Sequence, residues 1–236
     1  MTRGLTGTLL KVMGGKDFTL TVTDRTDLAE HRVRLGFDGG GLLTAHPTHP
    51  TMWVRLWFPR GAKLRQRAYT LIDPDPASDR FDVEFALHDG PAPNWARSAR
   101  PGDTIAATVH GSRYLPADPA PDGYLVIGDI ASLPAINSLL TATIGVPAKV
   151  WLEWQHEDDQ KAEVNPAALA EVTWVRRERE GADLVDAVRA AAFDAAGHRA
   201  WVACDTSTTR AVVSVLREDY GLARTDITAQ GYWLAR

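Results

Sequence analysis

The hydrophobic pattern of this chain changes period near residue 117, and this change constrains the fold more than any other feature. Before it, short segments such as 18–24 and 51–58 alternate apolar and polar residues. That period of two is typical of half-buried antiparallel strands. After the proline-containing segment 115–122, short apolar runs such as 124–127 alternate with longer stretches of helical spacing. Such runs are typical of parallel strands that are buried on both faces.

The change of period predicts a β domain followed by an α/β domain. We expect residues 1–116 to form an antiparallel β-barrel of the six-stranded type and residues 117–236 to form an α/β domain with a mostly parallel sheet. A Pro/Asp turn is expected at 73–76. The C-terminal half is predicted to contain helices at 132–143, 182–193 and 206–220. Thr206 is the expected N-cap of the last of these helices.

Composition narrows the class of protein. The chain has 236 residues and a formal net charge of −4, which argues against a nucleic-acid partner. Cys204 is the single cysteine, so an internal disulfide and a cysteine-ligated iron–sulfur cluster are excluded. No apolar run approaches the roughly 20 residues that span a bilayer, and residues 1–16 lack the apolar core of a signal peptide. We therefore expect a cytoplasmic protein without a membrane span.

Residues 67–70 combine a cation, an aromatic ring and a hydroxyl on one predicted strand. Because residues i and i+2 share a face of a strand, Arg67 and Tyr69 point to one side and Thr70 to the other side or to an edge. A flavin site needs such a set, with a guanidinium for the pyrophosphate and a ring to pack on the isoalloxazine. The tetrapeptide alone also occurs by chance in ordinary strands, so its assignment to a flavin site depends on motifs elsewhere in the chain.

A second candidate phosphate site follows the predicted strand 80–88. The segment 90–96 contains Pro93 near the first turn of a short predicted helix. A helix start offers free backbone N–H groups and a positive dipole, which suit a pyrophosphate. A capped surface helix without a ligand is the alternative interpretation of the same residues.

Several short motifs along the chain resemble those of the ferredoxin–NADP reductase superfamily. More specifically, the chain is similar to the siderophore-interacting protein family of flavin-dependent ferric-siderophore reductases. It is also similar to the siderophore-interaction domain fused to some mycobacterial iron-siderophore transporters. The motifs occur in the family's order and at about its spacing: Arg67-Ala68-Tyr69-Thr70, Leu87-His88, Gly90-Pro91-Ala92 with Trp95-Ala96, Gly128-Asp129 with Leu133-Pro134-Ala135-Ile136, and Gly231-Tyr232-Trp233.

The resemblance implies a set of FAD-binding residues in the N-terminal half. Those around the flavin ring and its phosphates are Arg67, Ala68, Tyr69 and Thr70. Of these, Tyr69 and Thr70 are the implied catalytic residues, with the Thr70 hydroxyl near the flavin N5. The implied contacts to the adenosine-phosphate part and the pyrophosphate are His88, Asn94, Trp95 and Ala96.

The resemblance also implies nucleotide contacts in the C-terminal half, where the chain departs from the family pattern. The implied residues are Asp129, Ala131 and Ser132 in the loop near the adenine and nicotinamide, and Tyr232 and Trp233 as an aromatic pair that closes over the site. Where the family usually has Gly-Asp-Glu-Thr-Ala, this chain has Gly128-Asp129-Ile130-Ala131-Ser132. Where Ala-Gly-Glu is usual, it has Ala203-Cys204-Asp205. The lost polar groups predict weak nicotinamide binding.

The activity implied by the resemblance is an FAD-dependent reductase that takes electrons from NADPH or NADH and reduces a ferric siderophore. Reduction to Fe(II) weakens the grip of hard oxygen donors and releases the iron for use inside the cell. A protein metal site is not required, and the histidines show no ligand spacing. A siderophore- or flavin-binding protein without turnover and a reductase component that serves a protein partner are the alternatives. The basic residues that are candidates to attract an anionic siderophore are Arg55, Arg65, Lys149, Arg176, Arg177 and Arg179.

Overall fold

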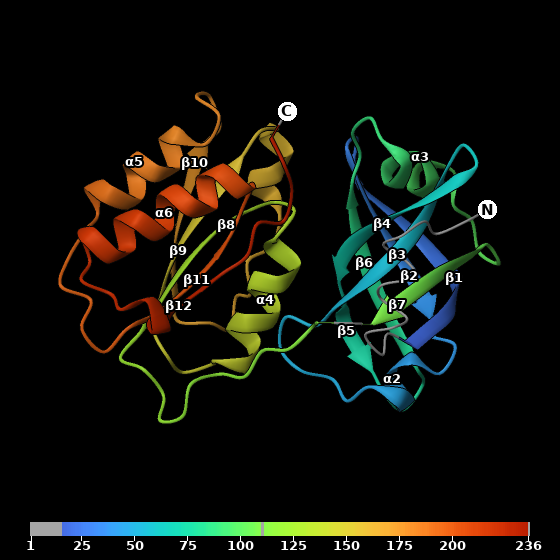
Figure 1. Cartoon of the computed structure of the whole chain (residues 1–236), viewed down its shortest axis with the longest axis horizontal. Helices are drawn as coiled ribbons and strands as arrows, with labels where there is room; N and C mark the ends of the chain where they lie inside the picture. The colour runs from blue at the N-terminus through green and yellow to red at the C-terminus, as the bar shows by residue number, and fades with distance from the viewer. Residues whose placement is uncertain (1–15, 110, 236) are drawn as a thin grey trace. The chain divides into compact units, whose positions relative to one another are not determined.

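The computed structural model describes residues 16–109 and 111–235 and divides the chain into two compact units. The barrel unit comprises residues 1–115 and the α/β unit residues 116–236 (Figure 1). Each unit has its own cluster of buried apolar side chains. Among the described helices, none has both the length and the apolar character that a bilayer span requires.

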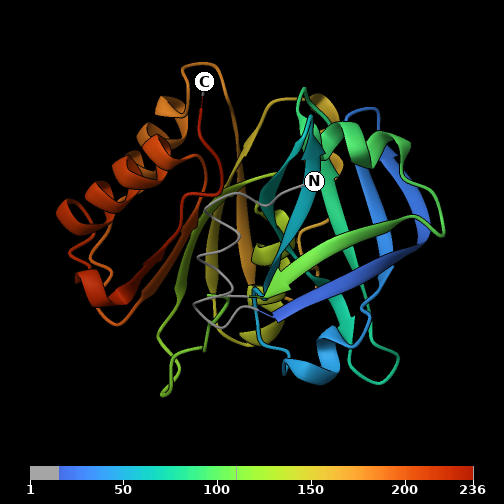
Figure 2. The same ribbon diagram turned by 45° about the vertical axis from the view of Figure 1, so that its right-hand side comes forward.

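The barrel unit contains a curled antiparallel sheet whose strands follow the order β4-β3-β7-β1-β2-β6-β5 (Figure 2). Its strands are β1 (Lys16–Ala29), β2 (Arg32–Asp38), β3 (Trp53–Arg60), β4 (Lys63–Thr70), β5 (Ile72–Asp75), β6 (Arg80–Ala86) and β7 (Thr104–Val109). The described part of the unit also contains two short helices, α2 (Leu42–Ala45) and α3 (Pro91–Ser98). The alternation in β3 buries Val54, Leu56 and Phe58 on the core face, as the sequence predicts.

The sheet has seven strands, one more than the expected six-stranded type. The additional strand β5 occupies residues where the sequence predicts a turn, so that part of the turn prediction is wrong. Because β5 is an end strand, Pro74 costs no hydrogen bond to a further neighbour. The turn comes later, where the Asp75 carboxylate accepts hydrogen bonds from the Ala77 N–H at 2.9 Å and from the Ser78 hydroxyl at 2.6 Å.

The α/β unit contains a parallel sheet with the strand order β10-β9-β8-β11-β12. Its elements are β8 (Tyr124–Asp129), α4 (Leu133–Ala142), β9 (Ala148–Trp154), η1 (Glu157–Lys161), β10 (Ala170–Arg176), α5 (Ala182–Ala190), β11 (Arg199–Ala203), α6 (Thr206–Glu218), η2 (Arg224–Asp226) and β12 (Ile227–Ala229). Helices α5 and α6 cover one face of the sheet and α4 the other (Figure 1). The strand order reverses between β8 and β11, so the carboxyl ends of these strands mark the usual ligand position of such folds.

Asp205, and not the expected Thr206, is the N-cap of helix α6. The Asp205 carboxylate accepts hydrogen bonds from the backbone N–H groups of Ser207 at 2.9 Å and Thr208 at 3.1 Å. The Thr206 hydroxyl instead donates to the Trp233 carbonyl at 3.1 Å. The carboxylate at the helix start therefore takes the capping role, and the hydroxyl anchors the C-terminal segment.

Candidate functional site

Strand β4 carries the Arg67–Thr70 motif at one end of the barrel sheet, where the strand has a sheet neighbour on one side. Arg67 is exposed, and its Nη1 donates to the Gln66 carbonyl at 2.8 Å. Within the described residues no carboxylate lies within ion-pair distance of Arg67. Ala68 is exposed, whereas Thr70, the last residue of the strand, is buried opposite Trp53. The motif thus presents one cation whose charge no described residue of the unit neutralises.

The ring of Tyr69 belongs to an aromatic cluster that joins β4 to helix α3. Its centre lies 4.4 Å from that of Phe85 and 6.0 Å from that of Phe58. Trp95 of α3 packs on the same two rings, at 6.2 Å from Phe85 and 5.7 Å from Phe58. Burial raises the pKa of the Tyr69 phenol well above its ordinary value, so the hydroxyl keeps its proton at neutral pH. The two predicted flavin motifs therefore meet at one place in the unit.

Helix α3 begins at Pro91, and no side chain caps its first turn. The first turn also contains no acidic residue. The other side chains assigned to this region have partners of their own: Asn94 Oδ1 accepts from Arg97 Nη1 at 2.9 Å, and His88 Nδ1 lies 2.9 Å from the Asp89 carbonyl. Ala96 is fully buried in the core, and Trp95 is half-buried and packs against it.

These features fit FAD on the chemistry of the donors. The uncapped start of α3 supplies its positive dipole and the Ala92 N–H to a pyrophosphate, because Pro91 and Pro93 have no N–H and the Asn94 N–H donates to the Gly90 carbonyl. Arg67 supplies a guanidinium that can bind the pyrophosphate without breaking an ion pair to a described carboxylate. The residues that would hold the cofactor are Arg67, Tyr69 and Thr70, together with the backbone of the first turn of α3.

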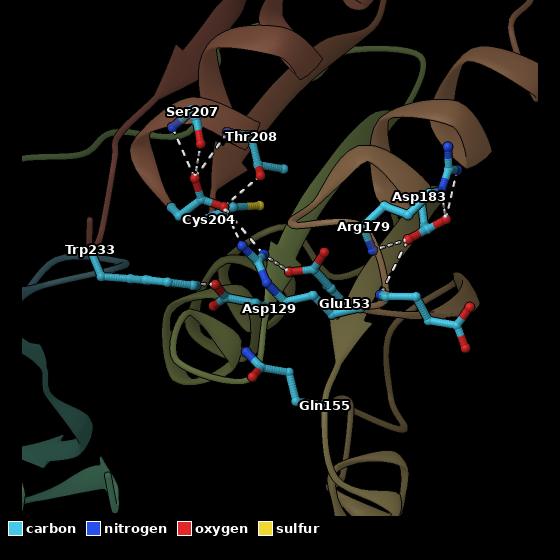
Figure 3. A network of polar contacts seen from close by, with 12 residues as sticks. Asp129, Glu153, Gln155, Arg179, Asp183, Cys204, Ser207, Thr208 and Trp233 are labelled. Carbon is cyan, nitrogen blue, oxygen red and sulfur yellow. Dashed lines mark hydrogen bonds and ion pairs between the residues drawn. The ribbon is translucent and has the colours of Figure 1, made fainter. Parts of the chain in front are cut away.

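A second group of predicted residues meets at the carboxyl end of β8 (Figure 3). Asp129 Oδ1 accepts from the Ser132 N–H at 3.0 Å, and Asp129 Oδ2 accepts from Trp233 Nε1 at 2.7 Å. Ser132 is fully buried, and its Oγ accepts from the Asp129 N–H at 2.9 Å. The Trp233 indole thus connects the C-terminal segment to the end of β8. Ala131 is exposed, and its backbone N–H is a further donor to the Asp129 carboxylate.

Tyr232 and Cys204 lie beside this group. The Tyr232 N–H donates to the Cys204 carbonyl at 2.8 Å, and the Tyr232 ring packs edge-on against Trp201 at 6.2 Å. Cys204 is a free, buried cysteine, and burial raises the pKa of its thiol. The thiol is therefore kept protonated and inert.

Arg177 is the centre of a buried ion-pair network at the same edge of the sheet. Its guanidinium pairs with Glu153 and lies 3.3 Å from the Asp205 carboxylate. The guanidinium also stacks on the Trp233 ring, 4.9 Å from the ring centre. The side chain of Arg177 is only 10% exposed, so these contacts are shielded from water.

Two carboxylates pair with the one guanidinium, and Asp129 lies close enough to Glu153 to act on it electrostatically, so burial and mutual repulsion perturb the protonation of these acids. Burial raises the pKa of Glu153, with the Arg177 hydrogen bond opposing the shift. Burial likewise raises the pKa of Asp129, although Trp233 and Ser132 donate to it. Burial alone would raise the pKa of Asp205, but hydrogen bonds from Ser207 and Thr208 bring it below its ordinary value. Glu153 Oε1 is buried without a hydrogen-bond partner.

Sequence reasoning did not find Glu153, and it assigned Arg177 to a siderophore-attracting surface. The available signal was positional, because both residues lie at the carboxyl ends of predicted strands, where parallel sheets gather functional groups. The same correction applies to other basic residues of that surface. Lys149 pairs with Glu171 at 2.8 Å, and Arg179 pairs with two aspartates. Of that set, Arg65 remains exposed without an ion pair to any described residue.

Two family models match the chain, one over each unit. Residues 2–111 match the siderophore-interacting FAD-binding domain, and residues 121–236 match the siderophore-interacting protein domain. Together the two matches extend from residue 2 to residue 236.

Named relatives and solved structures agree with these matches. The chain is 36% identical over 243 residues to the mycobactin import ATP-binding/permease protein IrtA of Mycobacterium tuberculosis, covering 100% of this chain and 28% of that protein. It is 27% identical over 177 residues to the ferric vibriobactin reductase ViuB of Vibrio cholerae, covering 71% of this chain and 64% of that protein. The siderophore-interacting protein SipS from Aeromonas hydrophila has the same fold, with a TM-score of 0.81, 20% identity and coverage of 93% and 92% of the two chains. The chain thus spans less than two thirds of the length of these two relatives, while it matches almost all of SipS.

Proposed function

Because the chain belongs to the siderophore-interacting protein family, we propose that it is a flavoprotein reductase that passes electrons from a nicotinamide donor through FAD to a ferric siderophore. The family match of residues 2–111 is to an FAD-binding domain. Two relatives of the chain are named for the reduction of ferric siderophores, ferric acinetobactin and ferric vibriobactin. The proposal extends that activity to this chain.

The observation that carries the proposal is the unneutralised Arg67 guanidinium on the strand that packs, through Tyr69, against the same rings as helix α3. Arg67 is exposed and forms no ion pair with a described residue, so its guanidinium is free to bind an anion that arrives from solvent. Here the matching anion is the FAD pyrophosphate, with Arg67 and the first turn of α3 as its ligands. Tyr69 would then form the wall of the cofactor site on the core side, and Thr70 would offer a hydroxyl at the end of the strand.

The contribution of the protein to this reaction is to bind the cofactor and the substrates and to orient them. When bound, FAD accepts a hydride and returns single electrons, which is the conversion that a two-electron donor and a one-electron Fe(III) acceptor require. Hard oxygen ligands hold Fe(III) more tightly than Fe(II), so reduction releases the metal. The protonated Tyr69 phenol and the Thr70 hydroxyl are neutral donors, which stabilise a polar ring without adding charge.

The proposal is tested first by the absorbance spectrum of the purified protein and by its FAD content. We expect about one FAD per chain, as a single dinucleotide site implies. Anaerobic addition of NADH or NADPH should bleach the flavin, and a ferric tris-hydroxamate should then restore its colour while a chelator captures Fe(II). A protein that neither contains nor takes up FAD would contradict the proposal.

Two other functions give different outcomes in the same experiment. A non-catalytic binding protein would quench its fluorescence with the ferric siderophore but release no Fe(II). At the carboxyl-terminal ends of the parallel strands, Arg177 is already paired with Glu153 and Asp205. This pairing favours the binding-protein alternative, because a guanidinium that is already paired binds the nicotinamide donor weakly and turnover would be slow. A reductase component would reduce its flavin with the nicotinamide donor but release Fe(II) only after a protein partner is added.

A further inference from the structure

The cations at the carboxyl edge of the parallel sheet all have carboxylate partners. We define the carboxyl edge as the carboxyl-terminal ends of β8 to β11 and the loops that follow them. The described cations there are Lys161, Arg176, Arg177 and Arg179. Lys161 pairs with Asp158, and Arg176 lies 3.4 Å from Glu178.

The two other cations each contact two carboxylates. Arg177 pairs with Glu153 and with Asp205 at 3.3 Å. Arg179 pairs with Asp183 at 2.6 Å and with Asp186 at 2.8 Å. None of the four described cations is therefore available to an anionic ligand without breaking an ion pair within the chain.

Carboxylates also outnumber cations across the α/β unit. Residues 116–236 contain 18 of the 30 Asp and Glu residues but only 11 of the 26 Lys and Arg residues. At the carboxyl edge itself, Glu157 and Glu180 are exposed acids beyond those in the ion pairs above. The electrostatic field at this edge therefore opposes a further negative charge.

Arg210 of helix α6 is exposed and needs separate consideration. The helix buries Thr208, Thr209, Val212, Val215 and Leu216. With about 100° of rotation per residue, Arg210 lies on the opposite, solvent-facing side of the helix. It therefore faces away from the sheet and does not alter the charge balance of the loops.

NADH and NADPH differ only in the 2′-phosphate of the adenosine ribose. In dinucleotide-binding α/β folds an acidic side chain accepts the ribose 2′-hydroxyl, whereas an arginine accommodates the 2′-phosphate. A phosphate monoester carries about −1.5 to −2 charges at pH 7. We propose that the α/β unit selects NADH over NADPH as the electron donor, because the described residues of its carboxyl edge offer acids and no unpaired cation to the 2′ position. This inference rests on the proposed reductase function.

The exposed ion pairs do not remove this selectivity. An exposed pair such as Arg176–Glu178 is weak, so a phosphate can compete for the guanidinium. The displaced Glu178 carboxylate and the adjacent Glu180 would still face the phosphate. Like charges at a recognition site disfavour the wrong ligand even where one attractive contact forms.

The test compares the two nucleotides by binding and by kinetics on the FAD-containing protein. Calorimetric titration with NAD⁺ and NADP⁺ should give NAD⁺ the lower dissociation constant, by at least about tenfold. Anaerobic stopped-flow reduction should show the same order for NADH and NADPH, with the difference shrinking as salt rises. Equal affinity, tighter NADP⁺ binding or no binding of either nucleotide would overturn the inference.

A pair of matched variants shows whether the ion pairs cause the selectivity. Glu178→Gln frees Arg176 at the carboxyl edge and should improve NADP⁺ binding several-fold without changing NAD⁺ binding. Glu171→Gln makes the same charge change in an exposed pair with Lys149 at the opposite end of the sheet, and it should leave the ratio unchanged. Equal effects of the two variants would overturn the assignment to the carboxyl edge.

The same experiment separates this inference from the proposed function. If neither nucleotide reduces the flavin, the reductase proposal fails, while the calorimetric ratio still tests the preference. If NADPH reduces the flavin as well as NADH does, the function stands and the inference fails. Arg210→Ala then shows whether that exposed cation holds the phosphate, because NADPH affinity would fall in that variant alone.

Discussion

Strand β4 and the carboxyl edge of the parallel sheet both contain several cations, but the cations differ in whether carboxylates of the chain pair with them. On β4 the exposed cations Lys63, Arg65 and Arg67 have no carboxylate within ion-pair distance among the described residues. At the carboxyl edge every described cation is paired, and Arg177 is buried with two acids as its partners, Glu153 and Asp205. A cation without an internal partner is available to a ligand, whereas a buried cation with internal partners is part of the fold. The two regions should therefore respond differently to the same kind of substitution.

The largest expected effect on stability is that of Arg177→Met. This change leaves Glu153 and Asp205 buried without the cation that both of them contact. Removing one partner of a buried ion pair destabilises a protein by about 3–5 kcal/mol. Urea unfolding monitored by tryptophan fluorescence should show a loss of that size in the α/β unit.

The control for this substitution is Arg179→Met, two residues further along the chain. Arg179 also contacts two carboxylates, but its side chain is 60% exposed. Exposed pairs contribute about 0–1 kcal/mol, so the control should lose much less stability. Equal losses in the two variants would mean that burial of the network does not matter.

Arg67→Ala should have a large effect on FAD affinity and little effect on the apoprotein. One charge-assisted hydrogen bond contributes about 1.5–3 kcal/mol, which corresponds to roughly 10- to 100-fold in the dissociation constant. Because Arg67 donates only to the neighbouring Gln66 carbonyl, the fold loses little. Fluorescence titration of the apoprotein with FAD measures the affinity, and urea unfolding measures the stability.

Arg65→Ala is the matched control on the same face of β4. Arg65 is exposed and lies two residues before Arg67, outside the Arg67–Thr70 motif. We expect it to retain FAD binding. If both variants lose FAD equally, the loss reflects general charge on the strand and not the position of Arg67.

The raised pKa of Glu153 predicts that the stability of the protein depends on pH. For a carboxyl whose pKa is raised by folding, the stabilising contribution is present below the unfolded pKa and is lost as pH rises through the folded pKa. Glu153→Gln removes this titration but keeps an oxygen that accepts from Arg177. The stability of the variant relative to the wild type should therefore increase as pH rises through the raised, folded-state pKa of Glu153. A stability difference that does not change with pH, measured by urea unfolding, would refute this.

The smallest expected effect is that of Thr70→Val. The hydroxyl is buried at the end of β4, and its loss with retained shape leaves the other proposed FAD contacts in place. We expect FAD to stay bound and its reduction potential or its rate of reduction to shift. Anaerobic titration with dithionite and stopped-flow reduction by NADH measure these two quantities. Unchanged values would show that the Thr70 hydroxyl does not act on the flavin.

The sequence predicts the parts of the fold that depend on local pattern. Alternation along β3 and β4 and the apolar run of β8 are visible in short windows, because strands have a period of two and buried parallel strands are continuously apolar. The prediction fails at β5, because Pro74 favours a turn locally but is tolerated in an end strand. It also fails at the N-cap of α6, where Asp205 and Thr206 are both residue types that cap helices well. The Thr206 hydroxyl donates to the Trp233 carbonyl, and Asp205 takes the capping position.

The polar network could not be predicted because its members are distant in sequence. Asp129 and Trp233 are 104 residues apart, and Glu153 and Arg177 are 24 residues apart. Only the strand order of the sheet brings them to one edge. Sequence spacing therefore yielded a prediction for the β4 residues, which lie within one strand, and missed the pairing of residues that come from four strand ends.

The most direct test of the account is the yield of Fe(II) from a single anaerobic reaction. The FAD-containing protein is mixed with a limiting amount of NADH, a ferric tris-hydroxamate and an Fe(II) chelator. A hydride carries two electrons and each Fe(III) takes one, so we predict about two Fe(II) per NADH, with the flavin oxidised again at the end. No Fe(II) above the protein-free control, or an equal rate with FAD-free protein, would contradict the assignment of this chain as a flavin-dependent ferric-siderophore reductase.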